Sequence, residues 1–237
     1  MVDIHCHILP DFDDGAVDIY ETLEMAKIAV NSGIRTIIAT PHCNVPEQPL
    51  NYYGPLYEET FKKAVSVIKE AGLELTLLKG MEVFVTFDLP SLIKEGKILT
   101  LNNSRYLLVE FDFCEDPEFV DFMIDRIVNL GLVPVVAHPE RYEFVKYNPH
   151  ILTTLKNKGC IFQSNKDSFS GNHGSTAKKI AFEMLSNNQT SIIASDAHSM
   201  KFRTPDTTKA RALLEDTYDI ETLFVKNPEK ICKDMPI

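Results

Sequence analysis

Histidine and acidic residues stand at or just after the ends of several runs whose composition predicts β-strands. The set is His5, His7, His42, Glu82, Glu110, His138, Asp196 and His198. The carboxyl ends of parallel strands in a barrel meet at one rim, which is where barrel enzymes build their active sites. Histidines with purely structural roles would be scattered through the core, so this common position predicts one shared site.

The residue types in this set are typical ligands of divalent cations. Imidazole and carboxylate groups together suit zinc, manganese and iron. Because alternate residues of a strand point to the same side, the motif formed by His5, Cys6 and His7 aims both rings in one direction. A carboxylate such as that of Glu82 can bridge two cations, and two cations about 3.5–4 Å apart can hold a hydroxide and clamp a phosphoryl oxygen. The predicted chemistry is therefore metal-assisted hydrolysis of a phosphate ester.

Strand-like and helix-like patterns alternate along the chain and would position these residues. Strands are predicted over residues 2–7, 36–40, 74–82, 106–111, 133–137, 160–163 and 191–195. The first helical pattern begins at a capping box formed by Asp18 and Glu21 and ends at Gly33. Seven strands separated by helices predict an α/β fold with a parallel sheet, closed or nearly closed into a barrel. A doubly wound open sheet is the alternative, but no glycine-rich phosphate loop follows the first strand.

Length and composition narrow the class of protein. The 237 residues are 44% hydrophobic and contain no repeat or linker, which predicts a single domain over residues 1–237. No run approaches the roughly 18 apolar residues of a membrane span, and aspartates interrupt any signal peptide near the N-terminus. We therefore expect a cytoplasmic protein without membrane insertion. Five widely spaced cysteines without a CxxC pair argue against a zinc ribbon, and the net charge of −10 argues against nucleic acid as a partner.

With these motifs in place, the chain resembles the PHP-superfamily, manganese-dependent protein-tyrosine phosphatases of bacterial capsule and exopolysaccharide operons. The resemblance spans nearly the full chain and rests on motifs in a fixed order. These are DIHCHILPDFDDGA at the start, TPHC around His42, the glutamates Glu82 and Glu110, AHPERY at 137–142 and ASDAH at 194–198. The resemblance implies a distorted (β/α)7 TIM-like barrel and three divalent metal ions, most commonly Mn²⁺, with Fe, Zn or Mg as alternatives.

The resemblance also implies roles for individual residues. His5, His7, Glu82 and Asp196 would hold the first metal, Glu82 would bridge to a second completed by Glu110 and His138, and Asp14, His42 and His198 would hold the third. Asp11 and Asp13 lie close to Asp14 and compete for its role. Arg141, in the HPER motif, would orient the phosphate with paired hydrogen bonds, and Arg203 would be a second phosphate contact. Three cations (+6) outweigh four ligand carboxylates (−4), so an acidic protein is compatible with an anionic substrate.

The implied function is that of a protein-tyrosine phosphatase that hydrolyses phosphotyrosine by metal-bound hydroxide. Its implied partner is a phosphotyrosine protein, a bacterial tyrosine kinase of polysaccharide export. A thiol phosphatase is excluded because it requires Cys-x5-Arg, and no cysteine here has an arginine six residues on. The segment over residues 44–57 predicts either an aromatic wall beside the metals, formed by Tyr52 and Tyr53, or an ordinary proline-punctuated loop.

Three other functions are compatible with the PHP superfamily. Histidinol-phosphate phosphatase remains open, because the metal ligands alone do not separate it from a tyrosine phosphatase. A nuclease of this superfamily is disfavoured by the acidic net charge. A non-catalytic regulatory barrel would have lost metal ligands, whereas every ligand position in this sequence is filled.

Overall fold

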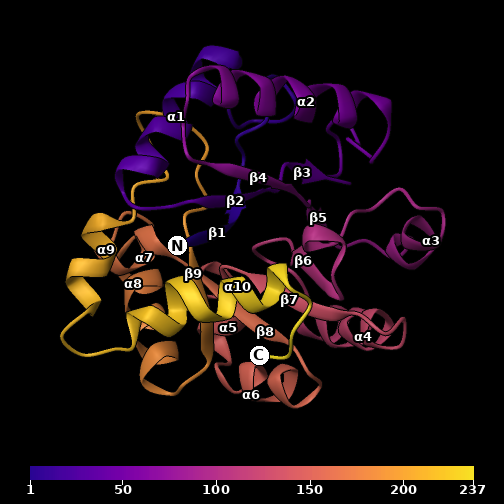
Figure 1. Cartoon of the computed structure of the whole chain (residues 1–237). Coiled ribbons are helices and arrows are strands. Elements are labelled where there is room, and N and C mark those ends of the chain that lie inside the picture. The colour runs from indigo at the N-terminus through magenta and orange to yellow at the C-terminus, as the bar shows by residue number, and fades with distance from the viewer.

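Nine short strands alternate with helices along the chain, and each strand is parallel to its neighbours (Figure 1). The structure is a computed structural model that describes residues 1–237. Its elements are β1 (Val2–Cys6), α1 (Ile19–Asn31), β2 (Thr36–Ala39), β3 (His42–Cys43), α2 (Pro55–Glu70), β4 (Thr76–Lys79), β5 (Glu82–Phe84), α3 (Leu89–Lys94), η1 (Leu101–Asn103), β6 (Tyr106–Glu110), α4 (Pro117–Val128), β7 (Val133–Ala137), η2 (Pro139–Arg141), α5 (Glu143–Tyr147), α6 (His150–Asn157), β8 (Ile161–Asn165), α7 (Lys166–Ser170), α8 (Ser175–Ser186), β9 (Thr190–Ala194), α9 (Thr208–Leu214), η3 (Thr222–Lys226) and α10 (Asn227–Cys232).

These nine strands occupy seven positions around a barrel. β2 and β3 are two halves of one position, and so are β4 and β5. The halves connect a three-stranded sheet, β1-β2-β4, to a six-stranded sheet, β3-β5-β6-β7-β8-β9. The ring closes beyond β1 and β9, where the His7 N–H donates to the Ala197 carbonyl (2.8 Å) and the Asp196 N–H donates to the His5 carbonyl (2.9 Å). The predicted α/β class and (β/α)7 barrel are confirmed.

The break between β4 and β5 lies at Gly80 and is caused by contacts of this residue with α2. The buried Tyr57 hydroxyl donates to the Gly80 carbonyl (3.0 Å) and accepts from the Gly80 N–H (3.2 Å), so both backbone groups of that residue are bonded to α2. A Cβ at Gly80 would also lie 2.7 Å from a methyl of Ile38. The single strand predicted over residues 74–82 is therefore interrupted, and Glu82 starts a new strand.

Strand residues alternate between the inside and the outside of the barrel. In β6, Leu107 belongs to a large cluster that includes residues of α4, whereas Tyr106 and Leu108 belong to a smaller cluster made almost wholly of strand residues. The smaller cluster is the barrel interior. Ile231 of α10 packs in it, and α10 lies against β1 and β9 (Figure 1). The next inward position of β6 is Glu110, so the interior changes from apolar to acidic at the carboxyl ends of the strands.

The first strand departs from strict alternation. Its pairing with β2 shifts register between Asp3 and Cys6. As a result Ile4 packs in the interior cluster and Cys6 in the outer one, although strict alternation along a strand would place both on one face. The Asp3 carboxylate accepts from the N–H groups of His5 (3.3 Å) and Ser195 (3.0 Å), which fastens β1 to the segment that follows β9.

The two ends of α1 lie where the sequence predicts them. The Asp18 side chain accepts from the Glu21 N–H (2.8 Å), and the Glu21 carboxylate accepts from the Val17 N–H (3.1 Å), so α1 begins as predicted. Gly33, with a φ of 93°, follows its end. No helix combines the length and the apolar composition needed to cross a bilayer.

Candidate metal centre

Side chains of the types that bind metals converge at the carboxyl rim of the barrel. Their ligand atoms form three groups, each within 4.8 Å: His7, Asp14, His42 and His198; His5, His7, Glu82 and Asp196; and His42, Glu82 and Glu110. His138 joins them, with its Nε2 3.1 Å from Glu82 Oε1. Asp14 comes from the loop before α1, and the others lie in or just beyond the strands. All nine residues predicted as metal ligands therefore share one rim.

The Glu82 carboxylate lies in the middle of the cluster. Its Oε2 is 3.0 Å from His5 Nε2, 3.2 Å from His7 Nε2 and 3.2 Å from His42 Nδ1. Its Oε1 faces His138. Burial by itself raises the pKa of Glu82, but the charges of His5 and His42 outweigh burial and hold the pKa well below its usual value. A carboxylate that reaches ligands on both sides suits the bridging of two cations.

Hydrogen bonds on the outer side of two rings decide which nitrogen carries the proton. His5 Nδ1 is 2.8 Å from Gln163 Oε1, and His7 Nδ1 is 2.7 Å from Asp13 Oδ2. Both oxygens can only accept, so Nδ1 of each ring carries a hydrogen and Nε2 is the nitrogen that faces the cluster. The two Nε2 atoms are 3.2 Å apart and face two carboxylates. Burial opposes the charged form of both rings, but the neighbouring carboxylates outweigh burial and raise the pKa of each. Positive charge is therefore stabilised at this point, and the donor set fits a divalent metal in place of the ring protons.

The turn that contains Asp13 and Gly15 holds the rim loop against β1. The buried Asp13 carboxylate accepts from the His42 N–H (2.7 Å) through Oδ2 and from the Gly15 N–H (3.0 Å) through Oδ1. A Cβ at Gly15 would lie 2.2 Å from the His7 carbonyl oxygen, so only glycine permits this approach. Both Asp13 oxygens are thus engaged, and Asp14 is the aspartate of this turn that faces the cluster.

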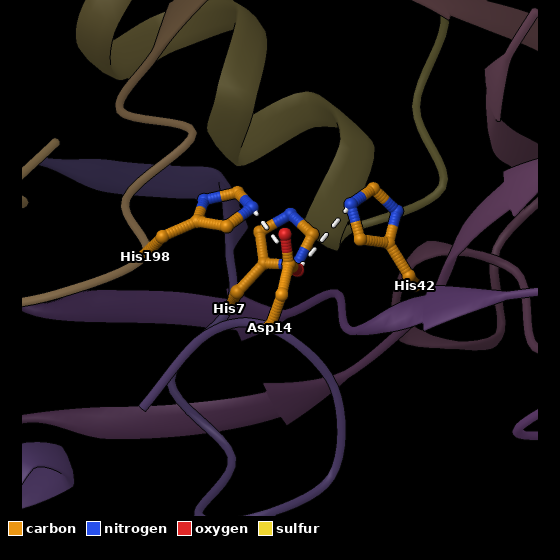
Figure 2. A group of neighbouring side chains, drawn as sticks. All are labelled: His7, Asp14, His42 and His198. Atoms are coloured by element: carbon orange, nitrogen blue, oxygen red, sulfur yellow. Dashed lines mark ion pairs between the residues drawn. The ribbon is translucent and has the colours of Figure 1, made fainter. Parts of the chain in front are cut away.

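Asp14 lies between two histidines, as Figure 2 shows. Its Oδ1 is 3.6 Å from His42 Nε2 and 3.5 Å from His198 Nε2. His198 Nδ1 is 3.0 Å from the Asp196 carbonyl oxygen, which can only accept, so the His198 Nε2 lone pair points toward Asp14 without a hydrogen-bond partner. Burial and the charge of His7 lower the pKa of His198 to about 2. The ring therefore stays neutral, which is the state that a metal ligand needs.

Glu110 adds a further carboxylate to the cluster. Its Oε2 is 3.5 Å from His42 Nδ1 and its Oε1 is 3.5 Å from His138 Nε2. Burial and the negative charges of Glu82 and Asp196 raise the pKa of Glu110 well above its usual value. Carboxylates crowded in this way do not all ionise unless positive charge is added. This crowding is independent support for the fit to cations.

Two arginines lie beside the cluster and contact the Asp196 carboxylate. Arg203 Nη2 is 2.6 Å and Arg141 Nη1 is 3.5 Å from Asp196 Oδ2. The Arg203 Nε–H is buried without a hydrogen-bond partner, which leaves a donor for an anion. His138, Asp196 and Arg203 have positive φ angles of 33°, 49° and 51°. Such backbone costs on the order of 1–3 kcal/mol per residue and concentrates at functional sites.

The sequence comparisons match the entire chain. The family described as "Capsular polysaccharide synthesis, CpsB/CapC" matches residues 1–233. This protein belongs to the CpsB/CapC family. The tyrosine-protein phosphatase YwqE of Bacillus subtilis is 35% identical over 239 residues, which cover 100% of this chain and 93% of YwqE. The tyrosine-protein phosphatase CpsB of Streptococcus pneumoniae is 31% identical over 250 residues, which cover 100% of both chains.

A solved structure agrees with this membership of the CpsB/CapC family. It was determined in a study of YwqE and CpsB, described as "unique metal-dependent tyrosine phosphatases". It superposes on this chain with a TM-score of 0.92 at 33% identity and covers 100% of this chain and 96% of its own. The likeness therefore extends over the barrel and the loops that carry the cluster of candidate metal ligands.

The sequence did not predict a role for Gln163 and Asn165, which support the cluster of candidate metal ligands from outside. Gln163 Nε2 donates to Asn165 Oδ1 (2.8 Å), and Asn165 Nδ2 donates to Asp196 Oδ2 (2.5 Å). Since Gln163 also accepts from His5, these amides connect two of the predicted ligands. The signal in the sequence is a pair of polar residues two positions apart at a strand end, but the predicted strand stops at Gln163 and leaves Asn165 outside.

The segment over residues 44–57 forms a loop without the predicted aromatic wall. The Tyr52 hydroxyl donates to Asn44 (3.2 Å), and the Tyr53 hydroxyl donates to Glu58 (2.7 Å). The cavity beside Asp14 and His42 is lined from this segment by Val45 and Gln48 instead. Of the two alternatives, the ordinary loop is therefore the one observed, because both tyrosines are engaged within their own loop and helix.

We predict that Gln163→Met weakens Mn²⁺ binding by about 10- to 100-fold, the usual effect of removing the partner that orients a metal-binding histidine. Methionine fills the same space, but its thioether is only a weak acceptor for His5 Nδ1–H. Gln163→Glu is the matched control, because it keeps the acceptor and should bind Mn²⁺ more tightly than the methionine variant. Calorimetry measures the dissociation constants, and circular dichroism verifies folding. Equal affinity in the wild type and Gln163→Met would contradict the orienting role.

Proposed function

We propose that this protein is a metal-dependent protein-tyrosine phosphatase. The observation that carries the proposal is the convergence of imidazole nitrogens and carboxylates on one rim, bordered by two arginines. Such a site combines groups for cations with groups for an anion, as a phosphate ester requires. The names of YwqE and CpsB, both tyrosine-protein phosphatases, support phosphotyrosine as the substrate.

The proposed site holds three divalent cations, with Mn²⁺ as the first candidate. The proposed ligands are His5, His7, Glu82 and Asp196 for one cation, Glu82, Glu110 and His138 for the second, and Asp14, His42 and His198 for the third. His42 also turns Nδ1 toward Glu82 and Glu110, so it is placed to contribute to the second site as well. When bound, the cations lower the pKa of a water molecule to around 7 and neutralise phosphoryl oxygens.

The two arginines are proposed to hold the phosphate group. In this structure both guanidinium groups contact Asp196 Oδ2, on the side away from the histidines. The unpartnered Arg203 Nε–H and the paired N–H groups of Arg141 suit the planar, bidentate recognition of phosphate oxygens. Fixed donors around the phosphate stabilise the charge that develops in the transition state. The tyrosine phenol has a pKa near 10, so it leaves more readily than an alkyl alcohol and needs less proton donation.

The cysteines do not provide an alternative nucleophile. Cys6, Cys43 and Cys160 are buried, and burial raises the pKa of Cys43 and of Cys160 to about 12. A buried thiol of that pKa stays protonated and unreactive at neutral pH. The exposed Cys114 has no arginine at the spacing that a thiol phosphatase uses. Hydrolysis is therefore assigned to the rim cluster.

The proposed partner is a tyrosine-phosphorylated protein of capsular polysaccharide synthesis. The description of the matched family names that process. Within it, a tyrosine kinase of polysaccharide export that carries phosphotyrosine in a flexible segment is the partner we propose. A flexible segment would suit this site, because the cavities beside the cluster open at the protein surface.

We expect activity to depend wholly on metal and not on thiols. Chelation should abolish hydrolysis of p-nitrophenyl phosphate, and Mn²⁺ should restore it, because the ligand cluster has no other positive charge of that magnitude. Treatment with iodoacetamide should leave most activity in place. Inactivation by alkylation while the cations remain bound, as measured by metal analysis, would argue for a thiol mechanism instead.

Arg141→Ala should lower kcat/KM by about 100-fold or more, the usual effect of losing one fixed donor to the transition state. Metal content should stay at the wild-type level, since the guanidinium would act on phosphate. Asp196→Ala should lower both rate and metal content. Arg105→Ala is the matched control, because Arg105 is half-exposed and paired with Asp234 at the C-terminus. A near-normal rate for Arg141→Ala would remove that residue from the proposed site.

The proposed substrate class predicts a ranking of phosphate esters. A phosphotyrosine peptide should give a kcat/KM at least tenfold above histidinol phosphate, phosphoserine or phosphothreonine, a difference of about 1.4 kcal/mol in transition-state stabilisation. Free phosphotyrosine and p-nitrophenyl phosphate separate the effect of the leaving group from recognition of the peptide. If histidinol phosphate is preferred by tenfold or more, the tyrosine-phosphatase proposal fails while metal-dependent phosphoester hydrolysis stands.

A further inference from the structure

Phe113 lies between two cavities that adjoin the metal-binding cluster. One cavity, of about 220 Å³, is lined by Asp14, His42, Glu110 and Phe113 among others. The second, of about 260 Å³, is lined by Arg141 and also by Phe113. The Phe113 ring therefore borders both the cluster proposed to bind cations and the arginine proposed to bind phosphate.

The position of this ring is fixed by its surroundings. The Phe113 carbonyl accepts from the Glu143 N–H (2.8 Å), which ties the segment after β6 to the start of α5. Asp112 forms a turn in which its carboxylate accepts from the Cys114 N–H (2.8 Å). The ring centroid is 5.9 Å from that of the buried Tyr142. Although anchored in this way, the ring remains 40% exposed.

Arg141 packs against this exposed ring. Its guanidinium carbon is 4.6 Å from the Phe113 centroid, within the range of a cation–π contact. The contact holds the guanidinium over the ring while Nη1 stays 3.5 Å from Asp196. A phosphate held by this guanidinium would therefore have an aromatic surface next to it. That surface suits an ester whose alcohol is itself aromatic.

We infer that Phe113 is the residue that selects aromatic phosphate esters over alkyl esters. This inference rests on the proposed phosphatase function. When the phosphate contacts Arg141, the phenyl ring of the ester packs against Phe113 in the adjoining cavity. Aromatic pairs contribute beyond the area they bury when their rings meet edge to face or offset. An alkyl ester would bury less area there and would gain no such contact.

Calorimetry with two non-hydrolysable ligands tests the inference without any turnover. The Mn²⁺-loaded protein is titrated with phenylphosphonate and with methylphosphonate, which share the anionic group and differ in the ring. Wild type should prefer phenylphosphonate. In Phe113→Leu the ratio of the two dissociation constants should fall by about tenfold, because the side chain keeps apolar volume but loses the ring. Phe113→Tyr keeps the ring and should keep the ratio.

The matched control is Phe122→Leu. Phe122 is 46% exposed and has the guanidinium carbon of Arg126 5.4 Å from its centroid, so it presents a similar pair on α4. This variant should bind both phosphonates as wild type does. Metal analysis and circular dichroism verify that each variant is loaded and folded.

Two results would overturn the inference. One is an unchanged ratio in Phe113→Leu, and if both ligands are weakened equally, Phe113 acts only by positioning Arg141. The other is a wild type without preference for the phenyl ligand. Failure of the proposed function would appear differently, as phosphonate binding with the predicted ratio but no hydrolysis of phosphotyrosine peptide. The binding measurement thus separates the selectivity of Phe113 from the identity of the reaction.

Discussion

The Glu82 carboxylate is surrounded by ring nitrogens of four histidines at 3.0–3.2 Å, which reach it from the ends of β1, β3 and β7. Hydrogen bonds on the outer side of His5 and His7 hold Nδ1 of each ring, so Nε2 faces the cluster. The electrostatic constraint at this rim is the balance of charge among buried rings and carboxylates, and the carboxylates raise the pKa of both rings against the effect of burial. The barrel packing imposes the close approach, and bound cations would take the place of the ring protons.

The rest of the rim holds these groups in place. Asp13 bonds to His7 and to the backbone of His42, and Gly15 lets its turn approach β1. Backbone at positive φ in His138 and Asp196 is a further cost that the surrounding barrel sustains. Burying charged groups also costs free energy unless they are paired or ligate metal. The apolar interior provides the stability against which these costs are set, together with the helices around the strands (Figure 1).

An acidic protein can bind a phosphate ester if charge is distributed unevenly over it. The net charge is −10, yet the proposed cations would outweigh the ligand carboxylates, and Arg141 and Arg203 border the same site. The aromatic ring of Phe113 lies beside this positive region rather than within the core. Charge would therefore select the phosphate, and the adjoining ring would select the alcohol to which it is esterified.

The sequence by itself determined the seven-position barrel and the set of polar residues at its rim, because strand periodicity and residue type are local properties of the chain. It did not determine the interruption at Gly80, the register shift in β1, or the supporting roles of Asp13, Gln163 and Asn165. It also did not indicate Phe113, and it left open whether Tyr52 and Tyr53 form an aromatic wall or belong to an ordinary loop. Most of these features depend on hydrogen bonds and contacts between segments far apart in the chain, whereas Tyr52 and Tyr53 bond to residues nearby in the sequence. Only the closed barrel decides which of those segments meet.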